Sequence, residues 1–330
     1  MLTCILAIVA AGPSRAQTAN DFYRGRTVTL LVGSTAGGGY DQYARTLARF
    51  LGIHIPGNPA IVVQDMPGAG SLTSVLYLDN GAARDGTYMT IFNAGVLTDA
   101  ITDPAEARVD FRKVNWIGSV TPDLRICYTW GPAGIKTWDD LAGPKEVTLG
   151  ATGRASVSYN DIQMLKNVFH RNVRGIFGYP GRSEVHLAIR RGELDGECGS
   201  MAGLPDDFLK QKLVNVPVKI VSEQIEGIPV DTPYIGEFAK NDEGRDILKT
   251  LTAPNEVGRP FIASANIPAE RLKILRDAFD ETVKDPGFLE SAQTQNLSVL
   301  PMTGQKAQEL IASLYRVKPE TAAKAKAAIQ

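Results

Sequence analysis

The chain is organised around the stretch Leu30-Leu31-Val32-Gly33-Ser34-Thr35-Ala36-Gly37-Gly38-Gly39-Tyr40-Asp41, which reads as an apolar strand, a small-residue loop and the start of a helix. Consecutive glycines are unfavourable in conformational entropy, so such a loop usually needs a positive φ or a close approach of its backbone to something. A loop at a helix start offers free N–H groups and the positive end of the helix dipole. The stretch therefore predicts an anion site, for a carboxylate or a phosphate.

Length and charge narrow the class of protein. The chain has 330 residues, enough for two domains. Its 35 basic and 36 acidic residues leave a net charge of −1, and the absence of a basic run argues against a nucleic-acid-binding surface. No internal segment has the roughly 20 apolar residues that span a bilayer.

The N-terminus has its own composition. Residues 1–11 are almost wholly apolar, and Ser14-Arg15-Ala16 follows shortly after them. This pattern predicts a signal peptide, residues 1–16, cleaved after about Ala16, and hence an exported, periplasmic chain. A buried first strand is the alternative. No Lys or Arg precedes the apolar run, which suggests a start codon upstream of Met1.

Removal of the signal peptide would take Cys4 away and leave two cysteines, Cys127 and Cys198. In an oxidising compartment they would either form a disulfide or stay as two buried thiols that behave as small hydrophobes. The sequence alone leaves both alternatives open.

The order strand, small-residue loop, helix recurs along the chain. Short β-branched runs predict buried strands, each followed by small residues and then by apolar residues at helical spacing. These strands are expected at 27–32, 61–64, 88–92, 147–149 and 175–177. The pattern is typical of two α/β units with parallel sheets, in which ligands bind at the carboxyl ends of the strands.

Enzymatic interpretations of the first loop fail on their missing partners. Gly39 is followed by Tyr40-Asp41 and not by the Lys-Ser/Thr of a phosphate-binding loop, and the dinucleotide fingerprint is also incomplete. A nucleophile elbow with Thr35 in place of Ser would need an acid and then a histidine, but His170 and His186 lie on expected helices as surface residues. No His/Cys pair has metal-ligand spacing. We therefore expect no enzyme, no metal and no cofactor.

Glycine loops can simply be tight strand–helix turns. Four such loops at strand ends, two per unit, favour a second interpretation. Two domains facing each other, with helix N-termini aimed at one cleft, would form a receptor for a small acid.

Five segments extend this interpretation, in the order Gly37-Gly38-Gly39-Tyr40-Asp41, Val62-Val63-Gln64-Asp65-Met66-Pro67-Gly68-Ala69-Gly70, Asp85-Gly86-Thr87-Tyr88, Gly178-Tyr179-Pro180-Gly181 and Gly192-Glu193-Leu194-Asp195. Together they resemble the substrate-binding receptors of tripartite tricarboxylate transporters, the Bug-type extracytoplasmic solute receptors. Asp65 replaces the family's usual Asn, and one residue is inserted in the Asp-Gly-Tyr turn.

The resemblance implies an α/β, type II periplasmic binding protein fold with two domains, each a mostly parallel sheet flanked by helices, joined by a hinge of two crossovers. Domain 1 would hold residues 21–124 and 257–330, and domain 2 residues 125–256. The implied function is capture of a small organic acid in the cleft and its delivery to membrane transporter subunits by a monomeric receptor. There are two alternatives: a ligand-sensing receptor that signals to a partner protein, and an exported hydrolase.

The resemblance also implies the ligand-binding residues. On the first domain they are Ser34, Thr35, Ala36, Gly37, Gly38, Gly39, Tyr40, Asp41, Gly68, Ala69, Gly70, Ser71 and Asn93, and on the second Thr152, Arg154, Ala155, Ser156, Tyr179, Gly181 and Arg182. Arg154 stands where the family often has small residues, and it would clamp a second carboxylate if it points inward. A solvated arginine on the rim is the alternative, and the same pair of interpretations applies to Arg182. Tyr40 and Asp41 would either touch the ligand or only shape the helix start.

Overall fold

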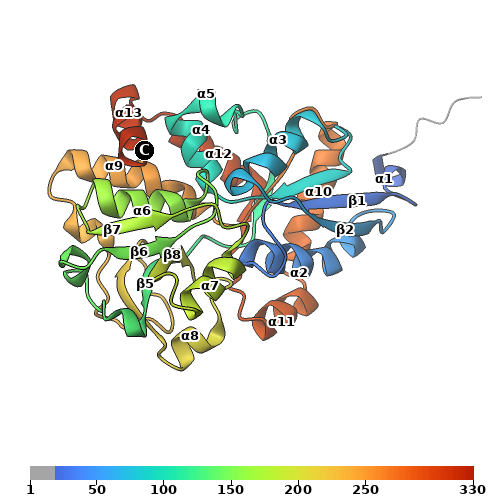
Figure 1. The fold of residues 1–330 in the computed structure, drawn as a ribbon. Helices are drawn as coiled ribbons and strands as arrows, with labels where there is room; N and C mark the ends of the chain where they lie inside the picture. Colours follow the sequence, from blue (N-terminus) through green and yellow to red (C-terminus); the bar gives the residue numbers. More distant parts are fainter. Residues whose placement is uncertain (1–18) are drawn as a thin grey trace, which may run out of the picture.

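The computed structural model describes residues 19–330, so the expected signal peptide and start lie outside the described residues. The chain forms two lobes side by side, each built on one mixed sheet with helices on its faces (Figure 1). Within residues 19–330, no helix is long and apolar enough to cross a membrane.

The first lobe contains a sheet of six strands. Their order across the sheet is β11 (Met302–Thr303), β4 (Asn115–Ser119), β10 (Pro260–Ala263), β3 (Tyr88–Ile91), β1 (Thr27–Val32) and β2 (Ala60–Asp65). Strand β1 runs parallel to β2 and β3, as expected, whereas β10 is antiparallel to β3 and β4. The sheet is mixed because β10 enters from the second lobe.

The second lobe contains a sheet of five strands. Their order is β7 (Val173–Ile176), β6 (Val147–Gly150), β8 (Gly196–Ser200), β5 (Arg125–Trp130) and β9 (Val214–Lys219). Strand β6 is parallel to β7 and β8, whereas β5 is antiparallel to β8 and β9.

Helices connect these strands and cover both sheets (Figure 1). The α-helices are α1 (Ala19–Phe22), α2 (Gly39–His54), α3 (Leu72–Asn80), α4 (Gly95–Thr102), α5 (Pro104–Ala107), α6 (Val157–Asn167), α7 (Arg182–Arg190), α8 (Asp206–Lys210), α9 (Asp242–Thr252), α10 (Ala269–Thr282), α11 (Pro286–Thr294), α12 (Gly304–Leu314) and α13 (Pro319–Ala328). Short 3₁₀ turns are η1 (Ala69–Ser71), η2 (Gly131–Ala133), η3 (Asp140–Ala142), η4 (Ile235–Phe238) and η5 (Ala253–Glu256).

Successive side chains along each strand point to opposite faces of the sheet and so pack into different layers of the core. In β10, Phe261 packs with α2, α10 and α11 on one face, whereas Ile262 packs with α3, α4 and α12 on the other. In β5, Cys127 and Tyr128 likewise face opposite layers. Because successive side chains of a strand point to opposite faces, a strand buried on both sides is apolar throughout. This explains the continuous apolar runs in the sequence.

Two segments of the chain cross between the lobes, one between β4 and β5 and one between η5 and β10. They are hydrogen-bonded to each other. Arg259 N donates to Thr121 O at 3.0 Å, and Asp123 N donates to Asn255 O at 2.8 Å. The paired segments are short and provide the place at which one lobe can turn against the other.

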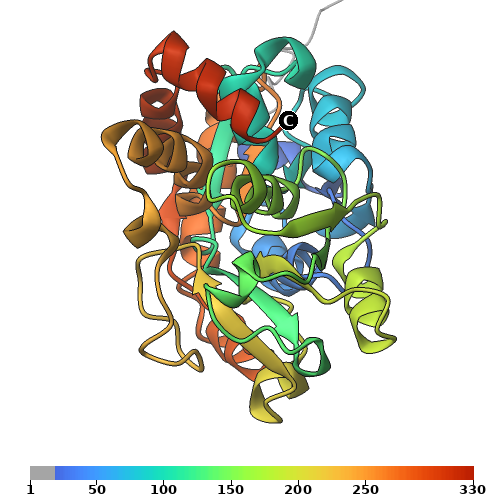
Figure 2. The ribbon, with the colours of Figure 1, turned by 60° about the vertical axis from the view of Figure 1, so that its left-hand side comes forward.

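The last helix, α13, contacts both lobes. It packs against α9 of the second lobe and α4 of the first (Figure 2). Ala325 and Ala328 join the core of the second lobe, while Lys326 Nζ lies 3.0 Å from Asp103 of the first. The predicted domain limits stay a prediction, but this packing places the end of the chain beside the second lobe and not within the first.

Cys127 and Cys198 form a disulfide between the paired strands β5 and β8. Of the two alternatives that the sequence left open, the structure therefore has the disulfide. Cys198 lies at the edge of a cavity between the lobes, so this covalent bond joins two strands beneath that cavity.

Candidate ligand-binding site

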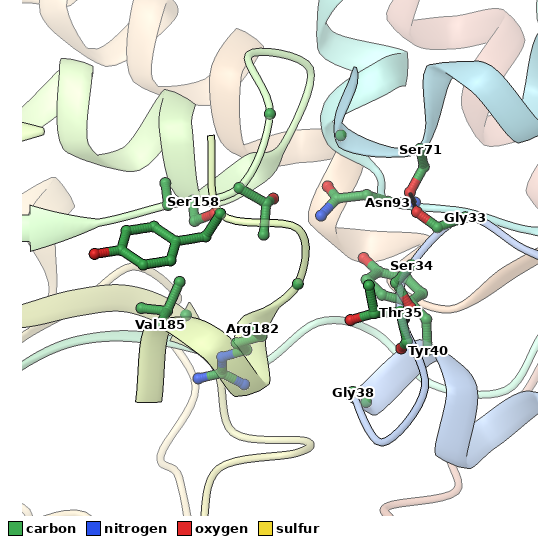
Figure 3. Close-up of a pocket in the computed structure, with 18 of the residues that line it drawn as sticks. Gly33, Ser34, Thr35, Gly38, Tyr40, Ser71, Asn93, Ser158, Arg182 and Val185 are labelled. Atoms are coloured by element: carbon green, nitrogen blue, oxygen red, sulfur yellow. Dashed lines mark hydrogen bonds between the residues drawn. The ribbon is translucent and has the colours of Figure 1, made fainter. Parts of the chain in front are cut away.

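A cavity of about 350 Å³ lies between the two lobes. It is lined by the loops after β1, β2, β6 and β7, at the carboxyl ends of parallel strands, as the strand–loop–helix pattern predicts. Figure 3 shows Ser34, Thr35, Gly38 and Ser71 on one side of it, and Ser158, Arg182 and Val185 on the other.

Most of the predicted binding residues line this cavity. They are Ser34, Thr35, Gly38, Gly39, Tyr40, Gly68, Ala69, Gly70, Ser71 and Asn93 from the first lobe, and Thr152, Tyr179, Gly181 and Arg182 from the second. The structure thus gathers residues from five loops around one space.

The remaining predicted residues lie elsewhere. Ala36 and Gly37 are exposed at the tip of their loop. Ala155 packs in the core of the first lobe, and Ser156 caps α6 by accepting from Tyr159 N at 3.3 Å. These four residues do not line the cavity.

Asp41 shapes the start of α2. Its carboxylate accepts a hydrogen bond from Gly37 N at 2.7 Å and pairs with Arg45 Nε at 2.6 Å. The side chain is buried and does not line the cavity. Of the two alternatives for Asp41, the structure has the one in which it shapes the loop, whereas Tyr40 lines the cavity.

Arg154 is exposed and points away from the cavity. It lies beside Asp99 and Asp103 of the first lobe and Lys326 of α13. The expectation that it clamps a second carboxylate in the cleft is therefore wrong, and the solvated alternative holds. The reason is that the loop after β6 turns its small residues, Thr152 and Gly153, toward the cavity.

Two helices begin at the cavity without a side-chain cap. Gly38 precedes α2 and Gly181 precedes α7, and neither helix start has a side chain accepting from its first N–H groups. Both glycines line the cavity. Uncapped N–H groups and the positive dipole end favour a negatively charged ligand at such a place.

Glycines from the two lobes also meet each other across the cleft. A Cβ added to Gly153 would lie 2.4 Å from Gly70 N, and one added to Gly39 would lie 2.9 Å from Ala202 O. The lobes therefore approach to backbone contact, and the structure is a closed arrangement. The glycines predict that the backbone comes close to another group. In the structure, part of this close contact is with the other lobe.

Asn93 connects the lobes beside the cavity. Its Oδ1 accepts from Gly95 N of the first lobe and from Val157 N of the second, each at 2.9 Å. Its own N–H donates to Ser71 Oγ at 3.0 Å, and Ser71 Oγ donates to Gly33 O at 2.7 Å. These bonds hold three of the lining loops in fixed positions.

The floor of the cavity contains buried charges that sequence reasoning missed. Arg125 lies between two acids, with Asp161 Oδ2 at 2.6 Å and Asp123 Oδ2 at 3.1 Å. Arg259 contacts Asp123 Oδ1 at 3.2 Å and lies 4.3 Å from the centre of the Tyr40 ring. Burial raises the pKa of Asp123, but the two arginines outweigh it and lower that pKa below its usual range. Asp123 is therefore ionised in the folded protein.

Glu197 and His186, which were not among the predicted site residues, lie beside Arg182, which was, at the start of α7. Arg182 Nε pairs with Glu197 Oε1, and Arg182 Nη1 donates to Ala202 O at 2.8 Å. His186, expected on a solvated helix face, is instead buried, and its Nε2 lies 3.5 Å from the same Glu197 oxygen. Charged residues inside apolar strand runs, such as Glu197 before Cys198, carry the signal that could have found these groups, because buried charges are almost always paired.

Among the described residues, those around Thr35 do not form the triad that the hydrolase alternative needs. Thr35 Oγ1 is buried without a hydrogen-bond partner, and none of the described residues that line the cavity is a histidine. In the described part of the chain, no three His, Cys, Asp or Glu residues are grouped so that they could hold a metal ion. The arrangement can bind and enclose a ligand.

Comparison with known proteins identifies folds that this chain resembles. No family model matches the chain. The periplasmic binding protein BugD superposes with a TM-score of 0.75 at 20% identity, covering 93% of this chain and 98% of that chain. The chain has the fold of the Bug-type periplasmic binding proteins.

Two further proteins are similar to this chain, one in structure and one in sequence. MatC from Rhodopseudomonas palustris, with bound malate, superposes with a TM-score of 0.72 at 18% identity, covering 93% of this chain and 99% of that chain. The UPF0065 protein in the TAR-I ttuE-ttuC′ intergenic region of Agrobacterium vitis is 23% identical over 277 residues, 82% of this chain and 75% of that protein. The expected likeness to Bug-type receptors is confirmed for the fold.

Proposed function

We propose that the chain is an extracytoplasmic receptor that captures a small organic acid in the cavity between its lobes. The observation that carries this proposal is the pair of uncapped helix starts, at Gly38 and Gly181, which face one enclosed space from opposite lobes. An acid that bridges the two helix starts would favour the closed arrangement, because a ligand shifts an equilibrium toward the state it binds better.

The receptor would be exported to the periplasm and would deliver its ligand to the membrane subunits of a tripartite tricarboxylate-type transporter. The Bug-type fold and the N-terminal sequence pattern support this role. The disulfide between Cys127 and Cys198 supports an oxidising compartment. We expect the receptor to be a monomer.

A thermal-shift screen tests the binding function. Purified chain starting at residue 17 is mixed with organic acids, neutral sugars and amines, and the melting temperature is recorded. At least one carboxylate should raise the melting temperature in a concentration-dependent manner, because a ligand that binds only the folded state stabilises it. If sugars or amines shift it and no carboxylate does, the proposal is wrong.

A further inference from the structure

The basic side chains around the cavity are already paired. Among described residues that line it, the only ones with a permanent positive charge are Arg125, Arg182 and Arg259. Arg125 and Arg259 contact Asp123, Arg125 also contacts Asp161, and Arg182 pairs with Glu197. Three arginines thus face three acids, so the protein offers a ligand no uncompensated cation there.

The Arg182–Glu197 pair is fixed in place. Both side chains lie against Gly199 of β8, where an added Cβ would fall 2.3 Å from Arg182 Nη2 and closer still to Glu197 Oε1. Burial raises the pKa of Glu197, but the charges of Arg182 and His186 outweigh it and lower that pKa to about 2. The carboxylate therefore stays ionised and neutralises Arg182 at every physiological pH.

One donor of this pair is left free. Arg182 Nη2 is buried and has no hydrogen-bond partner, although Nε and Nη1 of the same guanidinium are both used. Arg182 lines the cavity and faces Thr35 and Gly38 on the opposite side (Figure 3). A buried N–H without a partner destabilises the protein unless a ligand supplies an acceptor.

The starts of α2 and α7 also differ in the acidic side chains that surround them. At α2, Asp41 pairs with Arg45, and Arg45 also contacts Asp65 at 3.1 Å, so one cation is shared by two acids outside the cavity. At α7, Glu184 lies in the first turn, and its Oε2 is buried without a partner, 2.9 Å from the point where a Cβ on Gly181 would lie. Glu197 lines the cavity beside α7, whereas Asp41 and Asp65 do not line it, so a carboxylate in the cavity is favoured at α2 more than at α7.

We infer that the ligand carries a single carboxylate, bound at the start of α2, and that its far end is an uncharged oxygen acceptor bound by Arg182 Nη2. This inference rests on the proposed function and narrows its substrate class to monocarboxylates with a keto, hydroxyl or amide oxygen at the other end. A second carboxylate on the ligand would lose its hydration and lie near Glu197, with no unpaired cation beside it. Burying such an uncompensated charge is unfavourable.

Matched ligand pairs test the inference. Calorimetric titration compares succinate with succinamate, glutarate with glutaramate, and adipate with adipamate, which differ only by a carboxylate or a carboxamide at one end. The best monoamide should bind at least about tenfold more tightly than its own dicarboxylate. Equal binding, tighter binding of the dicarboxylate, or tighter binding of 4-aminobutanoate than of any monoamide would overturn the inference.

Two variants locate the effect. Arg182→Gln removes the free donor and leaves Glu197 uncompensated, so it should weaken binding of the monoamide about tenfold or more without shifting the preference toward the dicarboxylate. Glu197→Gln should shift the preference by about tenfold toward the dicarboxylate, since it frees the charge of Arg182. Arg154→Gln, at an exposed arginine outside the cavity, is the control and should change neither value. Unchanged affinity for the monoamide in folded Arg182→Gln, or an unchanged preference in folded Glu197→Gln, contradicts the inference, and if neither variant folds, the wild-type comparison decides it alone.

The outcomes separate this inference from the proposed function. If carboxylates bind but dicarboxylates bind best, the receptor function stands and only the inference fails. If none of these acids, and no other carboxylate in the thermal-shift screen, binds the chain, the proposed function fails and the inference fails with it.

Discussion

Asp99 lies on α4 in a group of charged side chains outside the cavity, with Arg154, Asp103, Glu106 and Lys326. Burial raises the pKa of the Asp99 carboxyl to about 7, with Asp103 and Glu106 acting in the same direction and Arg154 opposing them. In an unfolded chain the pKa of an aspartate is about 4. Between these values the folded state binds the proton more tightly, so protonation stabilises the fold as pH falls from about 7 to 4, and this stability is lost as pH rises again.

Replacing this carboxyl tests the pH dependence. Asp99→Asn should be more stable than the wild type at pH 8, by about 1–3 kcal/mol, with the difference vanishing near pH 4. Urea unfolding at pH 4, 6 and 8 measures it. Asp231→Asn, at an exposed aspartate, is the control and should follow the wild type at each pH. A destabilised Asp99→Asn variant at pH 8 would show that the carboxylate is needed as a partner of Arg154.

At the scale of elements, the loops after β2 and β6 meet at glycines. A Cβ on Gly153 would lie 2.4 Å from Gly70 N and 2.8 Å from Ala69 C, both backbone atoms of the other lobe. Because backbone cannot move aside like a flexible side chain, Gly153→Ala should hold the lobes apart while each lobe stays folded. The variant would rarely populate the closed state, which is the state that binds the ligand. Its ligand affinity should therefore fall about tenfold or more.

Small-angle scattering and calorimetry measure this effect. The ligand-saturated variant should be more expanded than the ligand-saturated wild type, and melting of the free protein should change little. Gly244→Ala, in the first turn of α9, is the control, because its Cβ would lie 3.2 Å from Asn241 Oδ1 and 4.0 Å from Ala239 Cβ and would meet no atom of the other lobe. Wild-type affinity in Gly153→Ala would mean that binding does not require these loops to touch.

Sequence patterns predicted the elements of this molecule better than the contacts between them. The alternation of strands, glycine loops and helices depends on local conformation, so the loops at 33–41, 66–71 and 178–181 were located correctly. Arg154 was misplaced because the direction of a loop side chain depends on how two lobes close, which has no local signature.

The missed charges have a similar cause. Asp123 and Arg259 come from the two crossing segments, which are far apart in the chain and adjacent only because those segments pair. Glu197 could have been singled out, since a carboxylate within a buried strand needs a partner. Its partner, Arg182, follows a glycine loop of a different strand, and only the folded sheet brings the two together.

At the scale of the whole molecule, the proposed receptor binds a small organic acid between its lobes through Gly38 and Gly39, which line the cavity at the start of α2. Gly38 has φ −77° and ψ 165°, a conformation open to any residue, and a Cβ there would meet its nearest neighbour, Thr35 O, at 3.6 Å. Gly38→Val should therefore fold normally while its side chain fills part of the cavity at the start of α2.

Calorimetric titration of the best acid from the thermal-shift screen into wild type, Gly38→Val and Ala36→Val tests this claim. Ala36 lies in the same loop, is exposed and does not line the cavity, so its variant is the matched control. Gly38→Val should lose about 100-fold or more in affinity with an unchanged melting temperature of the free protein, while Ala36→Val binds normally. Wild-type affinity in folded Gly38→Val would contradict the claim and remove this loop from the site.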